Sequence, residues 1–174
     1  MRILLEFIDR LSWLSARLAE WVVVILILSM VYEVVARYVF NAPTQWAFDI
    51  AYMSTGAIFV LGGAWTLRQD AHVRVDLFSA RMPPRLAQAV DGVVFLFLLA
   101  PVFGAFAWTA IGRAWEAWVR QEVEMVSPWA PLMWPFYSIL ALGLALLALQ
   151  LLAEGLRALA GRRVPEKVTE GVKA

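Results

Sequence analysis

Two ionisable residues interrupt an otherwise apolar stretch of this sequence, residues 21–40. Glu33 and Arg37 are four positions apart with the acid first, so on a helix they share one face and can pair. Ionisable residues inside a membrane span are costly and usually face protein or a water-filled cavity. Either Glu33 binds a proton or cation, or the two residues form an ion pair that docks this helix on a neighbour. An arginine partner stabilises the charged carboxylate and makes it a poor proton carrier, so the spacing favours the ion pair.

A turn and a second apolar stretch follow this pair. Residues 41–43 read Asn-Ala-Pro, which is typical of a turn, and Trp46 and Asp49 open the next apolar stretch. An acid in a first helical turn complements the helix dipole. Across the hairpin, Asp49 could instead pair with Arg37, and contact with a substrate is a third role open to it. We expect capping and pairing.

A polar loop, residues 68–85, contains the single histidine of the chain. His72 lies between Asp70 and Asp76, with Arg74 beside it, and His and Asp are metal-ligand types. A catalytic zinc site, however, requires three well-placed protein ligands, and two carboxylates with one imidazole in a loop are a weak pattern. We therefore predict hydrogen bonding within a folded loop, and no metal.

The third apolar stretch continues past the point where a span should end. Trp115, Trp118 and Glu122 follow at helical spacing, and Glu124 adds a second acid. Residues 92–122 as one helix would be about 46 Å long, against a hydrocarbon core of about 30 Å. Aromatic residues beside charges occur at recognition surfaces and also in interfacial anchors. Two hypotheses stay open for these four residues, docking of a partner outside the membrane and anchoring in lipid.

The composition of the 174 residues identifies the environment in which these groups lie. Hydrophobic residues make up 62% and charged residues only 17%, with a mean hydropathy of +0.70. Soluble domains are about 45–50% apolar and about 25% charged, so much of this chain must lie in lipid. The net charge of +1 gives no basic field for nucleic acid. The absence of Cys excludes disulfides, thiol catalysis and iron–sulfur clusters, and one His excludes a bis-histidine haem. We predict no cofactor.

The charge-free stretches predict an all-α integral membrane protein with four transmembrane helices. A span needs roughly 20 mostly apolar residues, and we place the spans at about 21–40, 46–67, 88–112 and 132–154. They form one domain, residues 1–162, followed by a flexible cytoplasmic tail, residues 163–174. Charges in the first twenty residues argue against a signal peptide. The leucines and phenylalanine of that segment recur at helical spacing and predict an amphipathic helix at the membrane interface (Leu4, Phe7, Leu11, Leu14, Leu18).

The distribution of Lys and Arg predicts the orientation. Twelve basic residues lie in the N-terminal segment, the second loop and the C-terminal tail, and three (Arg37, Arg113, Arg120) lie on the other side. Because cytoplasmic loops carry the excess of Lys and Arg, both termini are expected in the cytoplasm.

Two segments of the sequence resemble a known family. The order RYVFNAPTQW, then Asp49, then LGGAWTLRQDAHVRVDLFSARMP is similar to the small membrane subunit, of the DctQ type, of tripartite ATP-independent periplasmic (TRAP) transporters. The shared pattern covers residues 33–85, and the four spans with inside termini also agree. The chain departs from the family in one respect, because the family usually has two acids after the Trp and here Asp49 is alone.

This resemblance implies a function in the bacterial inner membrane without enzymatic activity. A large membrane subunit, which is another chain, would hold the substrate and coupling ions, and a periplasmic binding protein would deliver a small organic acid. The present chain would be the scaffold that braces the large subunit. The alternative is a small multidrug-type four-helix exporter that uses Glu33 as its proton or cation site, which Arg37 disfavours.

Overall fold

The computed structural model describes residues 2–69 and 84–160, and all named elements in these ranges are helices. In chain order they are α1 (Arg2–Tyr38), α2 (Ala47–Arg68), α3 (Pro84–Val93), the π-helix η2 (Val94–Leu99), α4 (Ala100–Arg120) and α5 (Trp134–Leu159). Four helical stretches are long and apolar enough to cross a membrane: Ile3–Tyr38, Ala47–Arg68, Gln88–Arg120 and Trp134–Leu159. The prediction of an all-helical chain with four spans is therefore confirmed.

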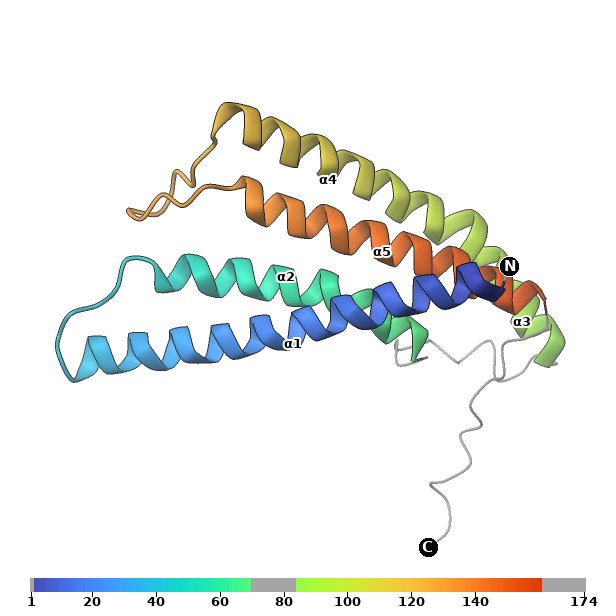
Figure 1. The fold of residues 1–174 in the computed structure, drawn as a ribbon, viewed down its shortest axis with the longest axis horizontal. Helices are drawn as coiled ribbons and strands as arrows, with labels where there is room; N and C mark the ends of the chain where they lie inside the picture. Colours follow the sequence, from blue (N-terminus) through green and yellow to red (C-terminus); the bar gives the residue numbers. More distant parts are fainter. Residues whose placement is uncertain (1, 70–83, 161–174) are drawn as a thin grey trace, which may run out of the picture.

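The four long helices lie side by side in the order α4, α5, α2, α1 (Figure 1). Helix α5, which is last in the sequence, lies in the middle of this array, because it packs on both α4 and α2. The first part of α1 also crosses over to contact α5, next to α3 (Figure 1). The turn after α1 and the loop after α4 lie at the opposite end of the array, which we call the loop end (Figure 1).

Helix α1 is continuous over 37 residues, and no separate helix precedes the first span. Its interfacial placement stays a prediction, but its buried face is now defined. Leu4, Phe7, Leu14 and Leu18 are about half exposed or more, whereas the buried face of the same helix combines two apolar residues with small and polar ones (Leu5, Ile8, Ser12, Ser15, Ala19). Small residues let helices in a membrane approach closely, while lipid accepts leucines as readily as a protein core does.

The third span consists of α3, η2 and α4 joined end to end, and it reaches Arg120 as its helical pattern predicts. The π-helix was not predicted. Pro101 follows it and has no N–H to donate to the preceding turn, while the N–H of Ala100 donates to the carbonyl of Phe95, five residues earlier. A proline inside an apolar helical run is therefore the feature of the sequence that marks this irregular turn.

Glycines allow α5 to approach its neighbours closely. A Cβ atom added at Gly143 would lie 2.8 Å from the backbone carbonyl carbon of Val60 in α2. At Gly155 it would lie 3.2 Å from the backbone nitrogen of Leu96 in η2. At these two positions the absence of a side chain therefore lets α5 lie close to α2 on one side and to η2 on the other.

Candidate functional site

The Glu33–Arg37 pair predicted from the sequence is present at the end of α1. The Nε atom of Arg37 donates to Oε1 of Glu33 over 2.8 Å. The other oxygen of Glu33 accepts hydrogen bonds from the backbone N–H of Thr44, over 2.9 Å, and from the Thr44 hydroxyl. Glu33 is 7% exposed, whereas the side chain of Arg37 is 55% exposed. Both oxygens of Glu33 are thus occupied, and together they hold the turn between α1 and α2.

The sequence did not indicate Thr44 as a partner of Glu33. The backbone of the turn makes this contact possible: Asn41 adopts a positive φ of 52°, and the N–H of Ala42 donates back to the carbonyl of Ala36 over 3.0 Å. Next to it, the ring of Trp46 stacks on Tyr32 with 5.7 Å between centroids. Trp46 therefore fastens the start of α2 to α1.

We expect the effects of substitutions at Glu33 and Arg37 to be unequal. Arg37→Gln leaves a buried carboxylate without its cation, which is the costlier situation, whereas Glu33→Gln leaves an exposed guanidinium that can reach water. Arg37→Gln should therefore reduce the yield of folded chain more than Glu33→Gln does, and the double variant should resemble Glu33→Gln alone. The measurement is the monodisperse fraction in size-exclusion chromatography at equal expression. Losses that simply add in the double variant would contradict the pairing.

Asp49 has a different partner from the one expected. It is 1% exposed in the first turn of α2 and accepts a hydrogen bond from the hydroxyl of Ser127, in the loop between α4 and α5. The expected ion pair with Arg37 is wrong, because Arg37 is directed to Glu33. As expected, Asp49 lies in the first turn of α2, where an acid interacts favourably with the helix dipole. The N-cap residue of α2 makes no side-chain capping hydrogen bond.

A second contact joins the same loop to α2. The Tyr52 hydroxyl donates to Glu124 over 2.9 Å, and the backbone N–H groups of Met125 and Val126 donate to the other oxygen of Glu124. The hydrogen bond from Tyr52, followed by that from Val126, lowers the pKa of Glu124 below its ordinary value. Asp49 and Glu124 therefore hold the loop against the start of α2.

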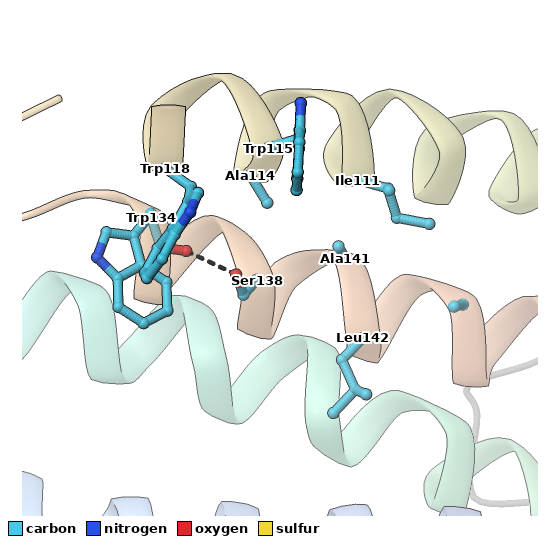
Figure 2. Close-up of a pocket in the computed structure, with 9 residues that line it drawn as sticks. Ile111, Ala114, Trp115, Trp118, Trp134, Ser138, Ala141 and Leu142 are labelled. Atoms are coloured by element: carbon cyan, nitrogen blue, oxygen red, sulfur yellow. Dashed lines mark hydrogen bonds between the residues drawn. The ribbon is translucent and has the colours of Figure 1, made fainter. Parts of the chain in front are cut away.

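The other candidates near this loop line a groove or form ion pairs. Trp118 packs edge-on against Trp134 with 4.6 Å between centroids, and Trp115 projects between α4 and α5 (Figure 2). These indoles border an apolar groove of about 540 Å³. Glu122 pairs with Arg113 over 3.0 Å. Both acids of the predicted docking surface, Glu122 and Glu124, therefore bind other residues of this chain. Other residues of the loop remain exposed.

The sequence analysis missed a buried polar site among the described residues, which joins α1 to α5 at the end opposite the loops. Gln150 is fully buried; it accepts a hydrogen bond from Ser12 over 2.8 Å and donates to Asp9 over 3.2 Å. Arg157 donates to both oxygens of Asp9, over 3.1 and 2.6 Å, and also to Glu154.

The network includes α2 as well, because Arg68 lies 3.2 Å from Asp9. Among the residues that the structure describes, two acids, Asp9 and Glu154, thus face two arginines, Arg68 and Arg157. The signal available in the sequence was the spacing of Asp9, Ser12 and Ser15, a polar and small stripe on the face opposite the leucines. In the sequence, the charged residues of this segment indicate only that it is not a signal peptide.

His72, Arg74 and Asp76 lie outside the described residues, so the predicted hydrogen bonding of their loop stays a prediction.

The comparisons with known proteins agree with the resemblance seen in residues 33–85. No curated protein and no solved structure matches the chain. Residues 10–161 match the family model described as tripartite ATP-independent periplasmic transporters, DctQ component. This match covers most of the 174 residues, well beyond the two segments that carry the resemblance. With its four membrane-spanning helices, the chain therefore belongs to the DctQ family and is a multi-pass inner-membrane component of a TRAP transporter.

Proposed function

We propose that this chain is the scaffolding small subunit of its transporter. It would brace the large membrane subunit during ion-gradient-driven uptake of a small organic acid, which a periplasmic binding protein delivers. Both termini would lie in the cytoplasm and the loop end would face the periplasm, as the distribution of basic residues predicts.

This proposal rests on one observation: both carboxylate oxygens of Glu33 are already bound within the chain. A transport site in a membrane needs a charged or polar group that is available to a substrate or ion. Oxygen Oε1 of Glu33 binds Arg37 and Oε2 binds Thr44, so the acid that an exporter would use is part of the turn. The four-helix exporter is therefore not favoured, and the family match supports a transporter component instead.

The array also offers broad apolar flanks to a membrane partner. Helix α4 packs mainly on α5, and large residues along it stay exposed, among them Phe106, Trp108 and Ile111. On α1, Ile27, Leu28 and Val31 are likewise exposed. These flanks can contact lipid and a larger helical subunit at the same time.

We infer that the loop end contacts the binding protein through the loop that holds Glu122 and Glu124, with Trp115 and Trp118 beside it. Met125 and Val126, at 93% and 89% exposure, are the most exposed large hydrophobic side chains of this loop. Glu122 and Glu124 would act mainly by shaping the loop, because Arg113 and Tyr52 bind them.

The test is reconstitution in liposomes with the large subunit and binding protein of the same system. Uptake of radiolabelled mono- and dicarboxylic acids is followed under a sodium or proton gradient. We expect no flux with this chain alone, little with the large subunit and binding protein alone, and full uptake with all three. Gradient-driven flux through this chain alone would overturn the scaffold function.

A further inference from the structure

The loop between α4 and α5 extends beyond the ends of both helices (Figure 1). We call its residues 125–130 the loop tip; within it, Met125 and Val126 are 93% and 89% exposed, and Trp129 is 45% exposed. A loop that is already held in its bound conformation loses less conformational freedom when a partner binds, and it therefore binds more tightly. The groups that hold the tip in one conformation thus influence its affinity for a partner.

Glu124 organises the first half of the loop tip. The backbone N–H groups of Met125 and Val126 donate to one oxygen of Glu124, over 3.1 and 3.2 Å. The other oxygen accepts a hydrogen bond from the hydroxyl of Tyr52 in α2, over 2.9 Å. The ring of Tyr52 packs edge-on against Phe136 of α5, with 5.7 Å between centroids. A side chain packed between helices therefore fixes Glu124 from outside the loop.

Ser127 organises the second half of the loop tip. Its hydroxyl oxygen accepts a hydrogen bond from the backbone N–H of Trp129 over 3.1 Å, and its carbonyl accepts one from the N–H of Ala130 over 3.2 Å. Ala130 has a positive φ of 48°, which closes this turn. A hydroxyl group has one hydrogen to donate, and that of Ser127 goes to Asp49, which is 1% exposed in α2. Helix α2 therefore holds this half of the tip as well.

The base of the loop is held together independently of α2. The N–H of Glu124 donates to the carbonyl of Pro131, and the N–H of Met133 donates to the carbonyl of Glu122, both over 2.9 Å. These hydrogen bonds join backbone groups on the two sides of the loop. Loss of a side-chain contact with α2 should therefore release the tip while the base stays paired.

We propose that Asp49 and Tyr52 are positioning residues for the binding protein, because they hold the loop tip in the conformation that this protein recognises. The inference rests on the contact between the loop end and the binding protein proposed above. A tip released from α2 samples several conformations, and the apparent affinity falls with the fraction of chains in the competent one. The loss of one hydrogen bond should weaken binding roughly twofold to tenfold.

The test uses the three-component liposomes described above, with uptake measured as a function of the concentration of the binding protein. Tyr52→Phe keeps the ring and removes the hydroxyl, and Asp49→Ala removes the acceptor of Ser127. In both variants the half-saturating concentration of the binding protein should rise roughly twofold to tenfold, while uptake at saturation stays unchanged. Asp49→Ala with Ser127→Ala should be no weaker than the weaker single variant, because Asp49 acts through Ser127.

Thr55→Val is the matched control on the same helix. Its hydroxyl donates to the carbonyl of Ala51 within α2, over 2.8 Å, so its removal should leave the half-saturating concentration unchanged. If Asp49→Ala fails to fold, Tyr52→Phe still tests the proposal, because it removes a single oxygen atom.

Hydrogen–deuterium exchange of the full chain measures the loop without any partner. Residues 125–130 should exchange faster in Tyr52→Phe and Asp49→Ala than in the unmodified chain and in Thr55→Val, with α4 and α5 unchanged. Unaltered exchange, or faster exchange with an unaltered half-saturating concentration, would overturn the proposal. Reduced co-purification of the large subunit with these variants would also overturn it, since the tip would then contact that subunit.

Failure of the scaffold function would be visible in a different sample. It would appear with the unmodified chain, either as full uptake when this chain is omitted or as flux through this chain alone. Failure of the positioning role would leave uptake by the unmodified components intact.

Discussion

Arg157→Met should lower the free energy of unfolding by about 3–5 kcal/mol, which is the usual cost of removing one partner from a buried ion pair. Arg157 is only 15% exposed, and after its loss Arg68, at 3.2 and 3.9 Å, is the arginine that remains beside Asp9 and Glu154 among the described residues. The measurement is unfolding in mixed detergent micelles, followed by circular dichroism. Arg10→Met, on the exposed side of the same segment of α1, should change stability by no more than about 0.5 kcal/mol.

The double variant Asp9→Asn with Arg157→Met separates this network from a simple loss of packing. Once Arg157 is absent, neutralising Asp9 removes a charge that has already lost one of its two arginines, so the combined effect should be smaller than the sum of the two single effects. Strict additivity, or an effect of Arg157→Met no larger than that of Arg10→Met, would contradict the assignment of a buried network to this end of the array.

Gly143→Ala should destabilise the chain by about 1–3 kcal/mol, as overpacking in a well-packed core does. The added methyl group would lie 2.8 Å from the backbone carbonyl carbon of Val60, and a backbone atom cannot give way as the end of a flexible side chain can. Helices α2 and α5 would have to move apart. The same unfolding experiment measures this effect.

Gly104→Ala is the matched control, because a Cβ atom at Gly104 meets nothing within 4 Å. Replacing glycine by alanine within a helix stabilises by roughly 0.5–1 kcal/mol where there is room. The two substitutions should therefore have opposite signs. A gain of stability at Gly143 as well would show that the contact with Val60 does not limit the approach of α2 and α5.

The spans and the Glu33–Arg37 pair were predictable because their signals are local. Long charge-free stretches identify helices that can cross lipid, and a separation of four residues places an acid and a base on one helix face. The hydrogen bond from Thr44 to Glu33 could not be predicted from such local spacing, because it depends on the geometry of the turn that contains Asn41.

The contacts that the sequence did not indicate join residues far apart in the chain. Ser127 is 78 positions from Asp49, and Ser12 is 138 positions from Gln150, so helical periodicity says nothing about either contact. The leucine pattern at the N-terminus had a further ambiguity. In water, a row of leucines marks the buried face of a helix, but in lipid the same row can face outward while serines make the contacts.

The central position of α5 has a consequence for how the protein is synthesised. Asp9 is separated by 148 positions from Arg157, which binds it, and ribosomes deliver the chain from its N-terminus. Helices α1 and α2 therefore enter the membrane while Asp9 and Ser12 have no partner in α5, and α4 arrives before the helix on which it packs. Until the last span is inserted, Asp9 has Arg68 of α2 as a partner but lacks Arg157 and Gln150. Its biogenesis thus includes a stage in which surrounding water, lipid headgroups or insertion machinery take the place of the partners in α5.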